Sequence, residues 1–263
     1  MKRKHLESAL SSIQREFPDP KITLEQYPTS PSLTASVILT ALERGDLGPG
    51  TTALDLGCGT GMLTLGCALI ETDLVLALDC DSDALQLAKE NVEEMELETA
   101  VEWIHAQVAS VISSSSPSSS TTTKNSNKSN NKRRFPPKGN MIQASTLETR
   151  QLIAQDKDGV PLHSRCVDTV LTNPPFGTKQ NAGMDLRFLR TACRLARRTV
   201  YSFHKTSTRA FLQQQVTAWG YSFHVVAEMQ FDLPQVYKFH KEKSRDIAVD
   251  LIRVDLICME NLG

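Results

Sequence analysis

The apolar positions of this 263-residue chain switch repeatedly between helical and strand spacing. Apolar residues three or four apart predict amphipathic helices, and short β-branched runs that end in glycine or proline predict strands. The expected helices span 2–16, 31–44, 62–71, 82–95, 184–198 and 207–219, with Ser30 and Ser82 as N-caps. The expected strands span 51–56, 74–78, 100–104, 167–171, 199–203, 221–231 and 246–258. Strands and helices alternate, which predicts a mostly parallel, doubly wound α/β sheet.

The last two expected strands are joined by a short connection, which predicts an antiparallel pair. The final strand is apolar at successive positions, so we expect both of its faces to be buried. Seven strands with a terminal antiparallel hairpin resemble the Rossmann-like sheet of the class I methyltransferases. We therefore expect a single methyltransferase domain over 1–263, with a helical extension at 1–20.

One segment interrupts the alternation. Residues 113–140 are rich in Ser, Thr, Asn and Lys, with six basic and no acidic residues and almost no large apolar side chains. Such a composition cannot bury enough surface to offset the entropy of ordering. We expect a low-complexity insertion over 109–164, disordered at least over 113–140. Its charge would allow weak contact with RNA, but the composition favours a passive linker.

The overall composition excludes several classes of protein. The chain has 29 basic and 30 acidic residues, so any nucleic-acid surface must be local. No apolar run approaches the length that crosses a membrane, and the basic N-terminus is not followed by the apolar stretch of a signal peptide. Six cysteines without a C-x-x-C pair indicate reduced thiols and no metal site. We expect a protein of the nucleus and cytoplasm.

A glycine-rich turn follows the first expected strand, at residues 55–61 (Asp-Leu-Gly-Cys-Gly-Thr-Gly). Glycines let a ligand approach the backbone closely, and Asp79 ends the next strand, where a carboxylate can accept both ribose hydroxyls of a nucleotide cofactor. A glycine loop alone also fits NAD, but its form and the motif described next favour S-adenosylmethionine. The expected cofactor-binding residues of this half are Asp55, Gly57, Cys58, Gly59 and Asp79.

Asn173-Pro174-Pro175-Phe176 directly follows the strand expected at 167–171. The two prolines must turn the chain out of the sheet, at the strand end where open α/β sheets bind ligands. This sequence is the signature of enzymes that methylate a planar nitrogen. The Asn173 side-chain oxygen and the Pro174 carbonyl would accept the two protons of an exocyclic amine, and Phe176 would stack on the base. All four residues are predicted to be catalytic, and Asn173 to touch the cofactor as well.

Basic side chains gather at two places further along the chain. Four arginines share one face of the helix expected at 184–198, and this pattern fits a solvated face as well as contact with phosphates: Arg187, Arg190, Arg194 and Arg197. The loop before the last strand mixes basic and aromatic residues, which favours nucleic-acid binding. The predicted RNA-binding residues of this loop are Lys238, Phe239, His240, Lys241 and Lys243.

Several stretches together resemble one family, the eukaryotic 18S ribosomal RNA adenine-N6 methyltransferases known as methyltransferase-like protein five. They are residues 24–29, 55–59, 173–179, 201–205, 237–241 and 250–253. The resemblance implies that Gln26 and Thr29 contact S-adenosylmethionine and that 173–176 is catalytic. It also implies a small zinc-binding activator subunit as a heterodimer partner. Gln107 stands where an Asp commonly holds the cofactor's adenine amino group, and its amide oxygen can accept the same hydrogen bond.

We therefore expect methylation of the N6 amine of an adenosine in 18S ribosomal RNA. Two alternatives remain open from the sequence. A protein glutamine N5-methyltransferase presents an amide nitrogen that suits the same motif, and it would transfer methyl groups to a peptide. A non-catalytic RNA-binding scaffold would bind RNA but no cofactor.

Overall fold

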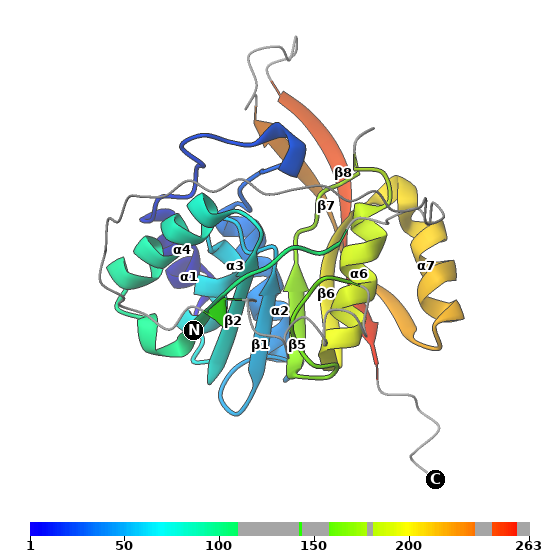
Figure 1. The fold of residues 1–263 in the computed structure, drawn as a ribbon, viewed down its shortest axis with the longest axis horizontal. Helices are drawn as coiled ribbons and strands as arrows, with labels where there is room; N and C mark the ends of the chain where they lie inside the picture. Colours follow the sequence, from blue (N-terminus) through cyan, green and yellow to red (C-terminus); the bar gives the residue numbers. More distant parts are fainter. Residues whose placement is uncertain (110–141, 144–157, 178–180, 235–243, 257–263) are drawn as a thin grey trace, which may run out of the picture.

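The computed structural model describes residues 1–109, 142–143, 158–177, 181–234 and 244–256, which surround one mixed sheet (Figure 1). The spatial order of its strands is β4-β3-β2-β1-β5-β6-β8-β7. The strands are β1 (Thr52–Leu56), β2 (Leu74–Asp79), β3 (Val101–His105), β4 (Ile142–Gln143), β5 (Val167–Thr172), β6 (Ala196–Lys205), β7 (Ser222–Pro234) and β8 (Ser244–Asp255). Seven of them match the predicted strands, which confirms the fold class. The sequence did not predict β4, two residues that pair parallel to β3.

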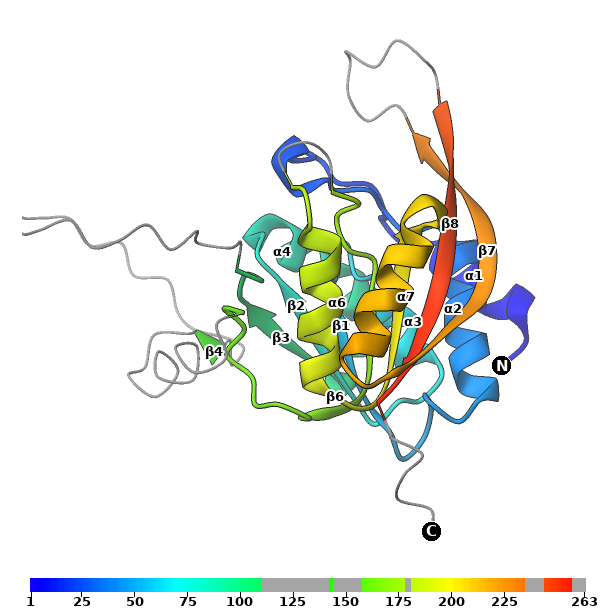
Figure 2. The same cartoon turned by 90° about the vertical axis from the view of Figure 1, so that its right-hand side faces the viewer.

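Helices cover both faces of the sheet (Figures 1 and 2). The helices are α1 (Arg3–Ser11), α2 (Pro31–Glu43), α3 (Met62–Leu69), α4 (Ser82–Glu94), α6 (Met184–Leu195) and α7 (Arg209–Ala218). Apolar residues of α1 to α4 form one core with the sheet, and those of α6 and α7 form a second core on its other face. No helix among the described residues is long and apolar enough to cross a membrane.

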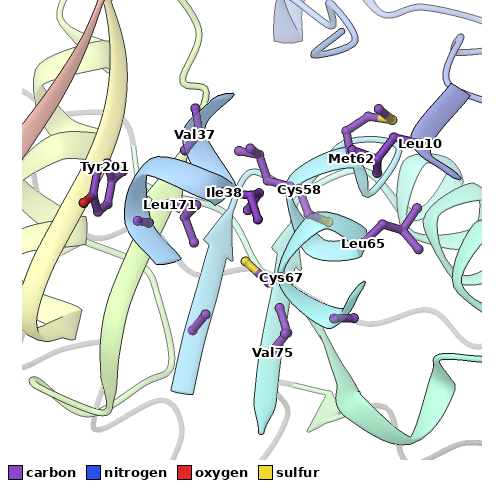
Figure 3. Close-up of a cluster of buried hydrophobic side chains, with 14 of the residues drawn as sticks. Leu10, Val37, Ile38, Cys58, Met62, Leu65, Cys67, Val75, Leu171 and Tyr201 are labelled. Carbon is purple, nitrogen blue, oxygen red and sulfur yellow. The ribbon is translucent and has the colours of Figure 1, made fainter. Parts of the chain in front are cut away.

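The first core depends on a close approach of α2 to α3, shown in Figure 3. Ile38 of α2 is fully buried, and a Cβ built on Gly66 of α3 would lie only 2.6 Å from its Cγ1. Glycine at position 66 therefore lets the two helices pack closely. Leu10 of α1, Leu65 of α3 and Leu171 of β5 are at most 1% exposed in the same core. This packing fixes the start of α2 relative to the sheet.

Two predicted element boundaries were wrong. Helix α4 is capped by Asp81 and not by Ser82, because the Asp81 carboxylate accepts the backbone N–H of Asp83 at 3.1 Å. Helix α6 ends at Leu195, earlier than position 198. The chain enters β6 at Ala196 because that strand pairs with β5 on one side and β8 on the other. Sheet pairing overrides the helical periodicity of this stretch.

The terminal strands form the predicted antiparallel pair, with β8 lying between β6 and β7. Four consecutive residues of β8, 249–252, are buried, which confirms burial of both its faces. The pairing of β6 with β8 stops at Lys205 and Val249. Beyond that pair, the described parts of β7 and β8 pair only with each other, so the hairpin projects past the carboxyl ends of the parallel strands (Figure 2). The predicted RNA-binding residues, within 238–243, lie outside the described residues.

The chain leaves and re-enters the fold at neighbouring points, where the insertion was predicted. The Ala109 N–H donates to the Asp158 carbonyl at 2.7 Å. Arg194 of α6 binds both Asp158 carboxylate oxygens at 2.6 and 2.9 Å, and Arg187 donates to the Ala109 carbonyl at 2.7 Å. Within the predicted insertion, Val160 is 1% exposed, so the chain is packed on the fold before position 164. The disorder predicted over 113–140 lies outside the described residues.

The four arginines of the predicted row contact the protein itself; Arg187, Arg190 and Arg194 lie in α6, and Arg197 lies in β6. Besides the two arginines that hold the ends of the insertion, Arg197 donates to the carbonyls of Arg165 and Cys166, both at 2.9 Å. The Arg190 guanidinium lies 5.2 Å from the centre of the Trp219 ring, a cation–π contact. Arg187, Arg194 and Arg197 therefore fasten the two ends of the insertion and the segment before β5 to α6 and β6, a role that neither of the two interpretations from the sequence anticipated.

Candidate active site

A cavity of about 460 Å³ opens at the carboxyl ends of the parallel strands. Its volume lies in the range of roughly 300–1,000 Å³ that small-molecule sites occupy. One wall comes from the N-terminal segment, another from the glycine turn after β1, and a third from the turn after β5. Seven of the predicted site residues line it: Gln26, Gly57, Gly59, Asp79, Gln107, Asn173 and Pro175. The structure thus brings together residues that are far apart in the sequence.

A second, larger cavity of about 840 Å³ runs along α6. Its lining includes Arg187, Arg190, Arg194 and Trp219, whose contacts with the protein's own chain are described above. It contains no residue of the glycine turn or of the Asn-Pro-Pro-Phe motif. By size alone the larger cavity would be the better candidate. The residues of the glycine turn and of the Asn-Pro-Pro-Phe motif line the smaller cavity, which we therefore take as the active site.

The glycine turn takes a backbone conformation that favours glycine. Gly57 and Gly59 have φ angles of +80° and +53°. The turn is anchored to the neighbouring strand, because the N–H of Gly57 donates to the Leu78 carbonyl at 2.8 Å. A Cβ on Gly57 would lie 3.0 Å from the Phe188 ring, and one on Gly59 would lie 3.1 Å from the Phe17 ring. Both rings line the cavity, and the sequence analysis missed them because neither belongs to a recognisable motif.

Asp79 lies at the end of β2, as predicted, and its carboxylate is fixed in place. One oxygen accepts the N–H of Gly59 at 2.8 Å and the other accepts the N–H of Asp81 at 2.9 Å. Burial raises the pKa of Asp79 above its ordinary value. Each oxygen keeps a second lone pair, so the carboxylate can still accept the hydroxyls of a ligand in the cavity.

Asp55 and Cys58 lie behind the glycine turn and do not line the cavity. The Asp55 side chain is 1% exposed, and its Oδ2 accepts both the N–H and the hydroxyl of Thr64, at 2.9 and 2.7 Å. Its Oδ1 has no hydrogen-bond partner among the described residues. Burial raises the pKa of Asp55 to about 7. Cofactor contacts of these two residues remain predictions.

The N-terminal segment is tied to the start of α4 beside the cavity. The Gln26 amide nitrogen donates to the Asp81 carboxylate at 2.7 Å, and its oxygen accepts the N–H of Lys21 at 2.7 Å. The Lys21 ammonium pairs with Asp81 and with Asp83. Gln26 and Tyr27 line the cavity. These contacts hold the segment across the mouth of the site without a covalent link.

Asn173 and Pro175 line the cavity, and Pro174 is buried beside them. The Asn173 amide nitrogen donates to the Thr29 hydroxyl at 3.0 Å. Phe176, in contrast, is only 9% exposed and packs edge to face on Phe231 of β7, with ring centres 5.6 Å apart and an interplanar angle of 87°. In this structure its ring belongs to the core and does not line the cavity, so stacking on a base stays a prediction.

Two contacts near the cavity could not have been found from motifs. The Asn181 amide donates to the Thr23 carbonyl at 2.8 Å and to the Glu25 carboxylate at 3.0 Å, which joins the loop after the motif to the N-terminal segment. Gln107 lines the cavity, and a Cβ on Gly159 would lie 2.6 Å from its carbonyl oxygen. The chain that returns from the insertion therefore passes directly against Gln107. Among the described residues, no cluster of His, Cys, Asp and Glu side chains could hold a metal ion.

Comparisons with known proteins agree with this geometry. The family profile of ribosomal protein L11 methyltransferases (PrmA) matches residues 29–117, which is the glycine-turn half of the chain. PH1948 from Pyrococcus horikoshii, a candidate RNA methyltransferase, has the same fold, with a TM-score of 0.67 and 24% identity over 99% of this chain and 98% of its own. The fold is that of a class I methyltransferase.

Relatives with a known type of substrate show which family of methyltransferases this chain belongs to. The rRNA N(6)-adenosine-methyltransferase METTL5 of Danio rerio is 37% identical over 96% of this chain and 98% of its own. The Mettl5 protein of Drosophila melanogaster is 37% identical over 97% of both chains. This chain belongs to the METTL5 family of rRNA N6-adenosine methyltransferases.

The residues present suit the S-adenosylmethionine that this class implies. Asp79 offers lone pairs to ribose hydroxyls, and Gly57 and Gly59 bring bare backbone to the cavity. The unpartnered Oδ1 of Asp55 lies behind the same turn, where a positively charged ligand nearby would be favourable. The cavity and its surroundings thus offer carboxylate oxygens that can accept hydrogen bonds from hydroxyl groups, and carboxylates favour a positively charged ligand. Both properties fit a cationic nucleoside.

Proposed function

We propose that this protein uses S-adenosylmethionine to methylate the N6 amine of an adenosine in 18S ribosomal RNA. The observation that carries the proposal is that Asp79 and Asn173, one suited to a nucleoside cofactor and the other to an amine, line the same cavity. Membership of the METTL5 family supports ribosomal RNA as the substrate class.

The cofactor, when bound, supplies a methyl group activated by a sulfonium. The protein's own residues supply position and polarity. Asp79, Gly57 and Gly59 would hold the nucleoside part, and Gln26 and Gln107 lie on the walls where its polar ends can be bound. Gln107 would accept the adenine amino protons through its amide oxygen.

At the acceptor side the chemistry needs a nitrogen whose lone pair is freed from the aromatic ring. The Asn173 oxygen and the Pro174 carbonyl would each accept one proton of the N6 amine. Two such hydrogen bonds favour a pyramidal nitrogen and aim its lone pair, so that positioning and electrostatics provide the rate enhancement. A base that is paired in the RNA must first be flipped out.

The proposal includes a partner and a location. By resemblance to its family the protein would form a heterodimer with a small zinc-binding activator subunit, and the metal would then belong to the partner. The predicted RNA-binding residues of the loop before β8 would contact the RNA: Lys238, Phe239, His240, Lys241 and Lys243. We place the protein in the nucleus and the cytoplasm, which fluorescence of a tagged copy would test.

The decisive experiment offers two acceptors to the protein, purified alone and co-purified with the activator subunit. Labelled S-adenosylmethionine is incubated with 18S ribosomal RNA or with a translation release factor. We expect label in RNA that digests to N6-methyladenosine. Label found only in the release factor would replace this proposal with protein glutamine methylation. If calorimetry shows RNA binding but no cofactor binding, the protein is a non-catalytic RNA-binding scaffold and the proposed function is wrong.

A further inference from the structure

The larger cavity, of about 840 Å³, lies directly beside the active site. Val108 lines both cavities. The two cavities also share α6, because Met184 and Phe188 line the active site while Arg187 and Arg190 line the larger cavity. A strand of RNA whose target base enters the active site would therefore bring its neighbouring nucleotides within reach of the larger cavity.

The lining of the larger cavity carries an excess of three positive charges. One of its residues is acidic, Asp158, and four are basic: Arg165, Arg187, Arg190 and Arg194. Both carboxylate oxygens of Asp158 accept hydrogen bonds from Arg194, so these two charges compensate each other. Within the part of the chain that the structure describes, the other three arginines have no carboxylate partner. A cavity lined by one sign of charge concentrates ligands of the opposite sign.

The three arginines without a carboxylate partner keep N–H groups that can still be donated. Arg187 uses its Nη1 for the neutral carbonyl of Ala109. Arg190 is exposed and lies over the Trp219 ring, and its N–H groups are hydrogen-bonded to no described residue. The same is true of the exposed side chain of Arg165. A guanidinium has five N–H donors in a planar fork, which matches the oxygens of a phosphate group.

These arginines come from two segments that the fold holds together. The backbone N–H of Arg165 donates to the Arg194 carbonyl at 2.8 Å, and the Arg165 carbonyl accepts a hydrogen bond from Arg197 at 2.9 Å. Arg187 and Arg190 are three positions apart on α6, so they lie on one face of the helix. Because the backbone brings the three cations to one cavity before a ligand arrives, less entropy is lost on binding.

A phosphate is the chemical group that this arrangement fits best, and an RNA strand is the source of phosphates that the position favours. RNA carries a phosphate at each nucleotide, so a strand can reach from one cavity into the other, whereas a free nucleotide fills only one. Trp219 and Tyr221 add aromatic rings to the lining, and such rings suit nucleobases.

We propose that the larger cavity binds phosphates of the RNA strand beside the target adenosine, with Arg165, Arg187 and Arg190 as the contacts. The inference rests on the proposed function and adds to it the path of the substrate over α6. It assigns these arginines to substrate affinity and not to the methyl transfer itself.

The test removes charge from the two exposed arginines, as Arg165→Gln, Arg190→Gln and the double variant. Arg187 stays unchanged because it also holds Ala109. Arg44→Gln is the matched control. Arg44 is exposed at the end of α2, on the opposite face of the sheet, and its side chain has no hydrogen bond or ion pair with a described residue. Thermal unfolding and the cofactor Kd by calorimetry check that each variant keeps its fold and its active-site cavity.

The Kd for labelled 18S ribosomal RNA is measured by filter binding at salt concentrations from roughly 50 to 200 mM. We expect each single substitution to raise this Kd by about three- to tenfold and to lower the slope of log Kd against log salt by about 0.7, the value for one phosphate contact to a single strand. The double variant should show both changes. The KM for RNA should rise in parallel, while kcat and the cofactor Kd stay within about twofold. Arg44→Gln should behave as wild type.

An RNA Kd and salt slope of the double variant equal to those of wild type would overturn the inference and leave the proposed function intact. An equal loss in Arg44→Gln would also overturn it, since the effect would then be one of overall charge. Millimolar AMP is the competing ligand. If AMP displaces RNA from wild type but not from the double variant, the cavity belongs to a free nucleotide. Label transferred only to release factor would overturn the proposed function, whatever the RNA Kd values are.

Discussion

Two aspartates are almost equally buried in this protein and are treated very differently. Asp46, 2% exposed, accepts hydrogen bonds from Arg253 at 2.9 Å and from Tyr201 at 2.8 Å. Asp55, 1% exposed and beside the glycine turn, is bonded only to Thr64 through one oxygen, and its other oxygen has no partner among the described residues. A buried polar atom without a partner costs about 1–3 kcal/mol. The carboxylate of Asp46, away from the cavity, is thus fully hydrogen-bonded, whereas one oxygen of Asp55, beside the glycine turn, has no partner among the described residues.

The same contrast explains what the family-specific stretches do. Tyr201 and Arg253 belong to two of the stretches that carried the resemblance, and both bind Asp46. Asp250, in the second of these stretches, binds Arg209 through two hydrogen bonds of 2.7 Å. Most of the charge in these stretches therefore holds β6 and β8 to their neighbours. Tyr201, Asp250 and Arg253 of these two stretches are therefore structural, whereas the glycine turn and the Asn-Pro-Pro-Phe motif, which mark the chemistry, belong to the broader class.

The largest expected effect is a loss of turnover from a change at Asn173, which lines the cavity, and it should leave the stability of the fold unchanged. We expect Asn173→Ala to reduce kcat by about a thousandfold or more, because it removes one of two acceptors for the amine protons. Cofactor Kd should stay within about threefold of wild type, since Asn173 mainly serves the acceptor. Turnover and calorimetry measure the two quantities. Wild-type turnover would contradict the role assigned to the motif.

The second effect should appear in stability alone. Asp46→Ala removes the acceptor of the Tyr201 hydroxyl and one of the two carboxylates that pair with the half-buried Arg253 guanidinium, which keeps Asp255. We expect the free energy of unfolding to fall by about 3 kcal/mol, the lower end of the cost of breaking a buried ion pair. Tyr201→Phe, the matched control, removes one neutral donor and should cost about 1 kcal/mol. Urea unfolding measures both. A smaller loss for Asp46→Ala than for Tyr201→Phe would remove the contrast between the two aspartates.

The third prediction concerns Asp55 and pH. Its pKa is raised from an ordinary 3.8 to about 7, so between these values the folded protein keeps a proton that the unfolded chain has lost. This group's contribution is therefore fully present below pH 4 and is lost as the pH rises to 7. Asp55→Asn mimics the protonated form and keeps an oxygen for Thr64.

The difference in unfolding free energy between Asp55→Asn and wild type should therefore rise from pH 4 to 7 in favour of the variant and then level off. Its full size is on the order of 4 kcal/mol, from about 1.4 kcal/mol per pKa unit. Urea unfolding without cofactor at four pH values tests this. A difference that does not change with pH would mean that Asp55 is ionised in the folded protein at pH 5.

The sequence was sufficient for the features that depend on local periodicity and on motifs. It predicted the seven longer strands, the terminal antiparallel pair, and the gathering of Asp79 and Asn173 at one edge of the sheet. It failed where a distant partner decides. The end of α6 depends on sheet pairing, and the burial of Phe176 depends on Phe231 of β7. The hydrogen bond between Asn173 and Thr29 joins residues 144 positions apart, so no local sequence pattern predicts it.

The smallest effect should come from removing the insertion. Replacing residues 110–157 with a short Gly/Ser linker joins two points that are already bridged by the hydrogen bond from the Ala109 N–H to the Asp158 carbonyl. Each halving of a closed loop returns roughly 0.6 kcal/mol of closure entropy, so the shorter loop should stabilise the fold by up to about 2 kcal/mol. The lost pairing of β4 with β3, only two residue pairs, offsets part of this gain.

We expect the deletion variant to unfold at the same urea concentration as wild type or a slightly higher one, with unchanged cofactor Kd. Arg194→Met in the full-length chain is the matched control, because it keeps the insertion and breaks the pair with Asp158. That control should be the less stable of the two, since Arg194 also donates to the Leu162 carbonyl at 2.7 Å. Weaker cofactor binding in the deletion variant would show that the insertion completes the wall beside Gln107, so that the cavity depends on this segment as well as on the glycine turn and the Asn-Pro-Pro-Phe turn.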